Sequence, residues 1–181
     1  MSSKHITWVA LGLCAGFASG CGDSDEKSDP AVAQAVMSEL VSSVDTTVTG
    51  YQSGGAGGGS VKLQCEPGGS ATVDGHVKVE VKPIGVDVQV AIAYDACQTK
   101  SGSTINGSID FTQTVQAGAT PVRVETVYQG DVKLTGKVQA DCAVDVHVLV
   151  DEAGKTVKVS GSVCGNDAAG LNLQVSPRWK S

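Results

Sequence analysis

The chain has 181 residues and carries 19 acidic against 13 basic side chains, for a formal net charge of −6 at pH 7. This acidic balance argues against a nucleic-acid-binding protein, because such proteins present a basic surface. The length suits one domain rather than two. After residue 20 the aromatic side chains are too few for a sugar-binding face of stacked rings; they are Tyr51, Tyr94, Phe111, Tyr128 and Trp179.

Residues 1–20 have the three parts of a secretory signal peptide. Lys4 makes the amino end basic, an apolar stretch runs from Ile6 to Ala18, and the small residues Ser19 and Gly20 follow it. The apolar stretch is shorter than the roughly 20 residues that a membrane-spanning helix needs. We therefore expect a cleaved signal peptide rather than a transmembrane anchor.

The sequence Ala18-Ser19-Gly20-Cys21 resembles the lipobox of bacterial lipoproteins. The resemblance implies that signal peptidase II cuts before Cys21 and that Cys21 carries diacylglycerol, which would tie the mature chain to a membrane. In Gram-negative members an Asp directly after this cysteine is a signal for the inner membrane; Gly22 stands there, which favours the outer membrane. Residues 21–30 are expected to form an acidic, hydrated tether. The alternative is an ordinary secreted protein without a lipid on Cys21.

Beyond Cys21 the chain has four cysteines, which are Cys65, Cys97, Cys142 and Cys164. An even number in an exported chain predicts two disulfides. The spacings of 32, 45 and 22 residues contain no Cys-x-x-Cys pair of the kind that structural zinc sites use, so we predict no metal site.

A helix is predicted over residues 31–48. Asp29 can cap its amino end, and Pro30 suits the first helical position. Because Val36, Leu40 and Val44 recur every four residues, the helix is expected to dock an apolar stripe on the rest of the domain, with a partner helix as the alternative. The Gly-rich run 49–60 is predicted to be a flexible linker. It lacks the Gly-Lys-Ser/Thr ending of a phosphate-binding loop.

From residue 61 to 177 apolar and polar residues alternate with a period of two. Val86, Val88 and Val90, for example, alternate with Asp87 and Gln89. This pattern is typical of antiparallel strands with one buried and one solvated face. We predict an all-β domain of about nine strands. In it, an antiparallel meander forms a strongly curved sheet, a small barrel or a sandwich, with one N-terminal helix.

A short repeat shapes these strands: an aliphatic residue, a small polar one, Gly, any residue, then Val or Ile. Its glycines lie on the core-facing row, where they let the sheet bend or let another backbone approach closely; they are Gly75, Gly107, Gly136 and Gly161. The segments that begin at Cys65 and Cys97 also resemble each other. Of the three possible connectivities, this similarity favours Cys65 with Cys97 and Cys142 with Cys164.

No catalytic pattern emerges from the remaining polar residues. His76 and His147 fall on the polar phase of their strands, where we expect solvated surface side chains. Asp141, Asp145 and Asp151 do not follow the spacing of a calcium-binding loop. We therefore expect neither catalytic residues, nor a cofactor, nor enzymatic activity.

Two functions stay open. The first is a non-enzymatic envelope or surface module, which acts as a structural component or through contacts with an unknown envelope protein. The second is a carrier or binder of a lipid or other apolar ligand. A curved sheet with Val-rich inner rows and a covering helix resembles the unclosed barrels of lipoprotein-transport factors. A solid core beneath the helix would favour the first function, and a large apolar pocket there would favour the second.

Overall fold

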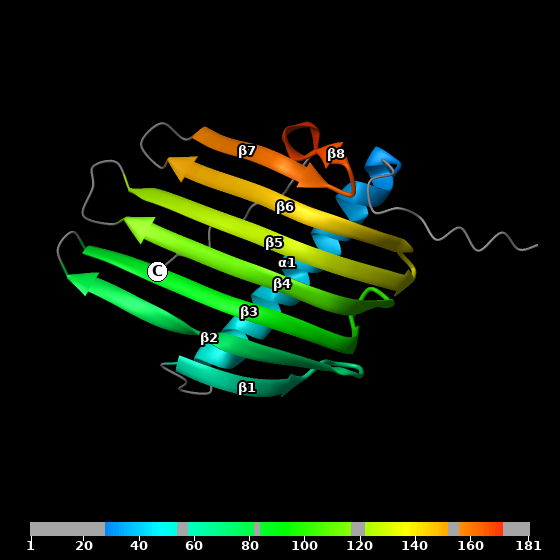
Figure 1. Cartoon of the computed structure of the whole chain (residues 1–181), viewed down its shortest axis with the longest axis horizontal. Helices are drawn as coiled ribbons and strands as arrows, with labels where there is room; N and C mark the ends of the chain where they lie inside the picture. Colours follow the sequence, from blue (N-terminus) through cyan, green and yellow to red (C-terminus); the bar gives the residue numbers. More distant parts are fainter. Residues whose placement is uncertain (1–27, 54–57, 82–83, 117–121, 152–155, 172–181) are drawn as a thin grey trace, which may run out of the picture.

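The computed structural model describes residues 28–53, 58–81, 84–116, 122–151 and 156–171. One helix, α1, precedes a single antiparallel sheet in which the strands pair in chain order (Figure 1). The bounds are α1 Pro30–Ser53, β1 Gly58–Gln64, β2 Ser70–Val81, β3 Ile84–Gln98, β4 Ser103–Gln116, β5 Arg123–Gly136, β6 Ala140–Asp151, β7 Thr156–Val163 and β8 Asn166–Asp167, followed by the 3₁₀ turn η1 Ala168–Gly170.

The predicted antiparallel meander is confirmed in its coarse form. Within the described ranges eight strands form one open sheet, which is neither closed into a barrel nor layered as a sandwich. The longest strands reach 14 and 15 residues, as in β5 and β3. The last part of the predicted β domain, residues 172–177, lies outside the described residues.

Helix α1 begins as the sequence predicts. The backbone N–H of Ala31 donates to the Asp29 carboxylate at 2.7 Å, which satisfies one of the amide groups that a helix start leaves unpaired. The apolar stripe docks on the sheet, with Val36, Leu40 and Val44 each at most 1% exposed. This helix therefore supplies one wall of the domain core rather than binding a partner helix.

Two boundaries predicted near the carboxyl end of α1, the end of the helix and the extent of the linker, are wrong. The helix continues to Ser53 instead of ending at residue 48, and β1 already begins at Gly58, so most of the expected linker 49–60 is regular structure. The cause is Tyr51, which is 1% exposed. Its hydroxyl donates to the carbonyl oxygens of Gly59 and Gly75, at 3.2 and 2.8 Å. Burial of this one side chain outweighs the low helix propensity of its neighbours.

Alternation along the strands sorts side chains onto two faces. On β6, Val144, Val146 and Val148 are at most 2% exposed and face α1, whereas Asp145 and His147 are exposed on the outer face. The same alternation holds on β5, where Val132 and Leu134 are buried. The sheet thus has an apolar inner face and a polar outer face.

Two of the repeat glycines show why a side chain is missing from the inner row. Gly107 and Gly161 have φ angles of +110° and +100°. A β-carbon at Gly107 would collide with the carbonyl oxygen of Asp131, and one at Gly161 with that of Asp145. Close approach of the neighbouring strand therefore accounts for both positions. Gly75 also abuts its neighbouring strand, and Gly136 ends β5.

The disulfides join Cys65 to Cys97 and Cys142 to Cys164, with Cα atoms 5.4 and 4.7 Å apart. These are the pairs that the repeat favoured. The first links the end of β1 to β3, and the second links β6 to the turn after β7.

Candidate functional site

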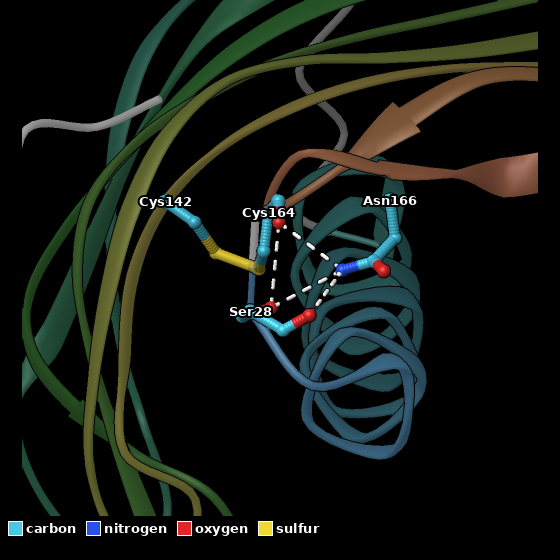
Figure 2. Close-up of a disulfide and its surroundings, with 4 residues drawn as sticks. All are labelled: Ser28, Cys142, Cys164 and Asn166. Atoms are coloured by element: carbon cyan, nitrogen blue, oxygen red, sulfur yellow. Dashed lines mark hydrogen bonds between the residues drawn. A yellow bond between two sulfur atoms is a disulfide. The ribbon is translucent and has the colours of Figure 1, made fainter. Parts of the chain in front are cut away.

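The amino end of α1 is fastened to the turn between β7 and β8. The backbone N–H and the hydroxyl of Ser28 donate to the carbonyl oxygen of Cys164, at 3.1 and 3.3 Å. The side-chain amide of Asn166 donates to the carbonyl oxygens of Ser28 and Cys164, at 3.0 and 3.2 Å. Figure 2 shows these groups beside the Cys142–Cys164 disulfide. We call Ser28, Cys142, Cys164 and Asn166 the joint.

The backbone of the β7–β8 turn places the accepting carbonyl of the joint. Cys164 and Gly165 have φ angles of +50° and +72°, positive at both central positions, as in the type I′ turns of two-residue hairpins. The N–H of Cys164 donates to the carbonyl oxygen of Ala143 at 3.0 Å. Together with the disulfide, this bond fixes the Cys164 carbonyl relative to β6.

The joint is shielded from water. Cys142, Cys164 and Asn166 are 6%, 2% and 3% exposed. Hydrogen bonds in such surroundings must be satisfied within the protein, because a lost partner leaves a desolvated polar group. The structure can therefore carry tension from the chain before Ser28 into β6 and β7 through hydrogen bonds and one covalent bridge.

The inner face of the sheet divides into two halves. Helix α1 runs diagonally behind the sheet, from the β7–β8 turn to β1 and β2 (Figure 1). Glu39 and Tyr51 of α1 make polar contacts with Ser101 and Gly75, and Ser28, just before the helix, contacts Cys164. Cys164 and Ser101 lie at the ends of the strands near the disulfides, and Gly75 lies in the middle of β2. Inner rows nearer the opposite ends of the strands lie beyond these contacts.

Beyond α1 one inner row consists only of valines, paired side by side across five strands. The row is Val86 on β3, Val115 on β4, Val124 on β5, Val150 on β6 and Val157 on β7. We call it the valine row. Its central member, Val124, is 2% exposed, whereas Val157 at the β7 end is 52% exposed. Val124 also stands outside the cluster of buried side chains that α1 completes.

Polar and aromatic groups border the valine row. In the adjacent inner row the Gln113 side-chain amide donates to the Thr126 hydroxyl at 3.5 Å. The rings of Phe111 and Tyr128 stack at a tilt, with centroids 5.3 Å apart. Burial raises the pKa of the Tyr128 phenol to about 12, and the nearby Tyr94 phenol adds to the shift. These groups would suit contact with a mainly apolar molecule or segment that carries an occasional hydrogen-bonding group.

Tyr94 lies under α1 and is also perturbed. Burial raises its pKa, and the side chains of Ser43 and Thr47 on the helix moderate the rise. Neither makes a hydrogen bond of ordinary geometry with the Tyr94 hydroxyl, which is left without a partner among the described residues. Such a phenol stays neutral at physiological pH, so we assign it a packing role.

The outer face does not bring the two histidines together. His76 on β2 and His147 on β6 lie in one cross-strand row but four strand spacings apart, or about 19 Å. His147 contacts Asp145 at 3.3 Å, and Asp141 pairs with Lys133 at 3.3 Å. Within the described ranges no three His, Cys, Asp or Glu side chains lie close enough to hold a metal ion.

A hollow of about 660 Å³ lies along β7. Its lining includes Glu125, His147, Leu149, Lys158 and Ala169. It is wide open and of mixed polarity, and it does not lie under α1. This hollow is therefore not the pocket beneath the helix that would favour a carrier of an apolar ligand.

Of the site residues predicted from the sequence, the four disulfide cysteines and the four repeat glycines fall on described parts of the chain. Cys21 and the signal region lie outside them, and the described helices include none long and apolar enough to cross a bilayer. Ser28 and Asn166 were missed. Ser28 was assigned to the tether, and nothing in the sequence marks Asn166 as buried.

Comparison of the chain with protein-family models, with curated proteins and with solved structures found no significant match in any of the three.

Proposed function

We propose that this chain is a bacterial lipoprotein, anchored through Cys21 in the envelope and acting there as a non-enzymatic interaction module. The observation that carries the proposal is the joint. Ser28, the first residue of the described domain, lies seven positions after Cys21, with six residues between them. A membrane-tethered module needs a firm attachment at that point. There Ser28 donates to the carbonyl oxygen of Cys164 and accepts from the side-chain amide of Asn166, beside the Cys142–Cys164 disulfide.

The short tether would hold the domain next to the bilayer. The seven Cα-to-Cα steps from Cys21 to Ser28 reach about 25 Å when fully extended. The β7–β8 end of the sheet, where the joint lies, would then face the membrane. Two or more acyl chains would supply the anchoring energy, at about 0.8 kcal/mol for each buried methylene group. Gly22 directly after the acylated cysteine favours the outer membrane as the destination.

The outer face of the sheet is the surface that such a module would present to an envelope protein. One cross-strand row carries carboxylates on alternate strands, at Asp74, Asp110, Asp145 and Asp167. With strands about 4.8 Å apart, these charges are spaced by about 10 Å. Polar contacts with a basic partner surface suit this arrangement.

Acyl labelling in a bacterial host tests the proposal. The wild-type chain should incorporate labelled palmitate, and Cys21→Ala should abolish the label. Cys14→Ala is the matched control, because it removes the other cysteine of the signal region and should leave the label in place. An unlabelled wild-type chain, or a Cys21→Ala variant that keeps its label, would refute the lipoprotein assignment.

The valine row favours a second candidate, a carrier of a lipid or other apolar ligand. It offers contiguous apolar surface beyond α1, with Val157 52% exposed at its β7 end. Native mass spectrometry of the intact mature protein tests this function. Mass that leaves on denaturation, beyond that of the anchor, would support the carrier. The mass of the acylated chain alone would count against it.

A further inference from the structure

Strand β7 forms an edge of the sheet over most of its length. It pairs with β6 from Thr156 to Val163, whereas on its other side β8 pairs only with Ser162 and Val163. In Figure 1 β8 lies beside the carboxyl end of β7, and no described strand lies beside the rest of it. We call residues 157–161 the β7 edge. Such an edge presents backbone groups that can pair with another strand.

The turn after β7 determines which backbone groups point outward. The N–H of Cys164 donates to the carbonyl oxygen of Ala143 at 3.0 Å, and the register of β6 and β7 runs without a shift. Because neighbouring residues of a strand direct their N–H and C=O groups to opposite sides, the even-numbered residues of β7 also bond to β6. Val157 and Val159 therefore direct two N–H donors and two C=O acceptors toward the open side.

The side chains of the β7 edge differ between the two faces of the sheet. Val157 is 52% exposed, and it is the one large apolar side chain classed as exposed among the described residues. Val159 is half-buried on the same inner face. Lys158 lies between them on the outer face and is the only charged residue of β7. All three line the open hollow, together with Ala169 of η1. A strand added here would meet valines on one face and a cation on the other.

From these observations we propose that the β7 edge binds an extended segment of another protein, which pairs with Val157 and Val159 as an added antiparallel strand. Main-chain hydrogen bonds hold such a strand, and its alternate side chains give specificity. The segment has apolar residues opposite the two valines and a carboxylate opposite Lys158, because opposite charges stabilise a cross-strand pair. This surface is distinct from the acidic outer row, and the proposal does not depend on the lipid at Cys21.

A second copy of the chain fits the β7 edge less well. Antiparallel pairing of two β7 strands with like faces aligned must be centred on one residue. Centring on Lys158 sets two lysines opposite each other, which destabilises a sheet. Centring on Val159 or beyond sets a residue opposite Ser162, where Asp167 of β8 already pairs. Centring on Val157 leaves only the first residues of β7 to pair. A separate acidic strand avoids all three conflicts.

Amide hydrogen exchange in the intact protein tests whether the β7 edge is open. Lys158 and Ser160, which bond to β6, serve as internal controls, and the amides of Val157 and Val159 should exchange several-fold faster than theirs. Equally slow exchange of the two valines in dilute protein would mean that the edge is already paired and would overturn the proposal. Protection of the valines that grows with protein concentration would assign the edge to a second copy and overturn it as well.

The synthetic peptide Val-Thr-Val-Glu-Val-Thr-Val, blocked at both ends, is the probe for binding. At a concentration of about nine times its Kd, exchange of Val157 and Val159 should slow about tenfold, because about a tenth of the protein is then free. N-methylation of the two valines beside the glutamate removes the amides that face β7 in antiparallel pairing and should abolish this protection. N-methylation of both threonines, whose amides face away, should leave it. No protection at millimolar peptide, or equal effects of the two methylated peptides, would overturn the proposal.

Lys158→Glu tests the charge preference at physiological ionic strength, which screens distant acidic side chains. The wild type should bind the glutamate peptide several-fold more tightly than Val-Thr-Val-Lys-Val-Thr-Val, and Lys158→Glu should reverse this order. Lys133→Glu is the matched control, because Lys133 is an exposed lysine on β5, away from the edge. Circular dichroism verifies that both variants fold. An order unchanged in Lys158→Glu, or reversed equally in Lys133→Glu, would overturn the proposal without bearing on the palmitate label at Cys21.

Discussion

The hydroxyl of Tyr51 on α1 donates to the carbonyl oxygen of Gly75 on β2, 2.8 Å away, and so ties the last turn of the helix to the middle of the second strand. The same hydroxyl reaches the carbonyl oxygen of Gly59 on β1, at 3.2 Å. With the joint at the other end, α1 is held to the sheet by polar contacts at both of its ends.

Tyr51→Phe should lower the free energy of unfolding by about 1–2 kcal/mol, because it removes a buried hydroxyl with two acceptors and keeps the ring. Tyr51→Ala should cost about 3–5 kcal/mol, since the side chain is 1% exposed and its removal leaves a cavity. Urea unfolding followed by circular dichroism measures both. Equal stability of Tyr51→Phe and the wild type would show that the hydroxyl contributes nothing.

Asn166→Ala should destabilise the domain by about 1–3 kcal/mol, because it removes a hydrogen-bond donor from the part-buried carbonyl oxygen of Ser28 and from the buried one of Cys164. The change should also free the amino end of α1, which faster amide hydrogen exchange at residues 31–34 would reveal. Asn106→Ala is the matched control. Asn106 accepts a hydrogen bond from Ala96 on the exposed side of the sheet, so its loss should leave exchange in α1 unchanged.

Gly107→Ala and Gly102→Ala separate two costs to stability: an unfavourable backbone conformation, and steric overlap of the new β-carbon with the neighbouring strand. Both glycines have positive φ, at +110° and +97°. A β-carbon at Gly107 meets the Asp131 carbonyl, whereas one at Gly102 meets nothing within 4 Å. Gly102→Ala should cost about 1–3 kcal/mol from conformation alone. Gly107→Ala should cost clearly more, and equal unfolding midpoints of the two variants would contradict the close-approach explanation.

Raising the pH should destabilise the domain through Tyr128. Its pKa is raised from 10.0 to about 12 in the folded state. The unfolded chain therefore loses this proton first, so the stabilising effect is complete below pH 10 and falls as the pH rises toward 12. The loss should reach about 2 kcal/mol. Tyr128→Phe should show a shallower decline over the same range, because Tyr94, whose pKa is also raised, still contributes.

Spectrophotometric titration of tyrosinate checks this assignment directly. Wild-type protein should titrate part of its tyrosine absorbance above pH 10, and the Tyr128→Phe variant should lose one residue's share of that late fraction. A late fraction unchanged in the variant would mean that Tyr128 titrates normally.

The sequence by itself determined the elements that depend on residues close together in the chain. Alternation of apolar and polar residues defined antiparallel strands with one buried face, because side chains in a strand point to opposite sides with a period of two. Asp29 and Pro30 set the start of α1, since a helix start needs an acceptor for its unpaired amide groups. The likeness of the segments after Cys65 and Cys97 indicated the disulfide pairs that the structure contains.

Only the tertiary structure decided what depends on neighbours distant in sequence. Helix α1 extends past its Gly-rich limit because Tyr51 finds acceptors on β1 and β2. Asn166 is a buried donor only because the chain returns to Ser28, 138 positions earlier. The diagonal course of α1 across the sheet, from the β7–β8 turn to β1 and β2, is likewise set by contacts between distant segments. A period in the sequence states which face of a strand is buried, but the partner that buries it is set by three-dimensional packing.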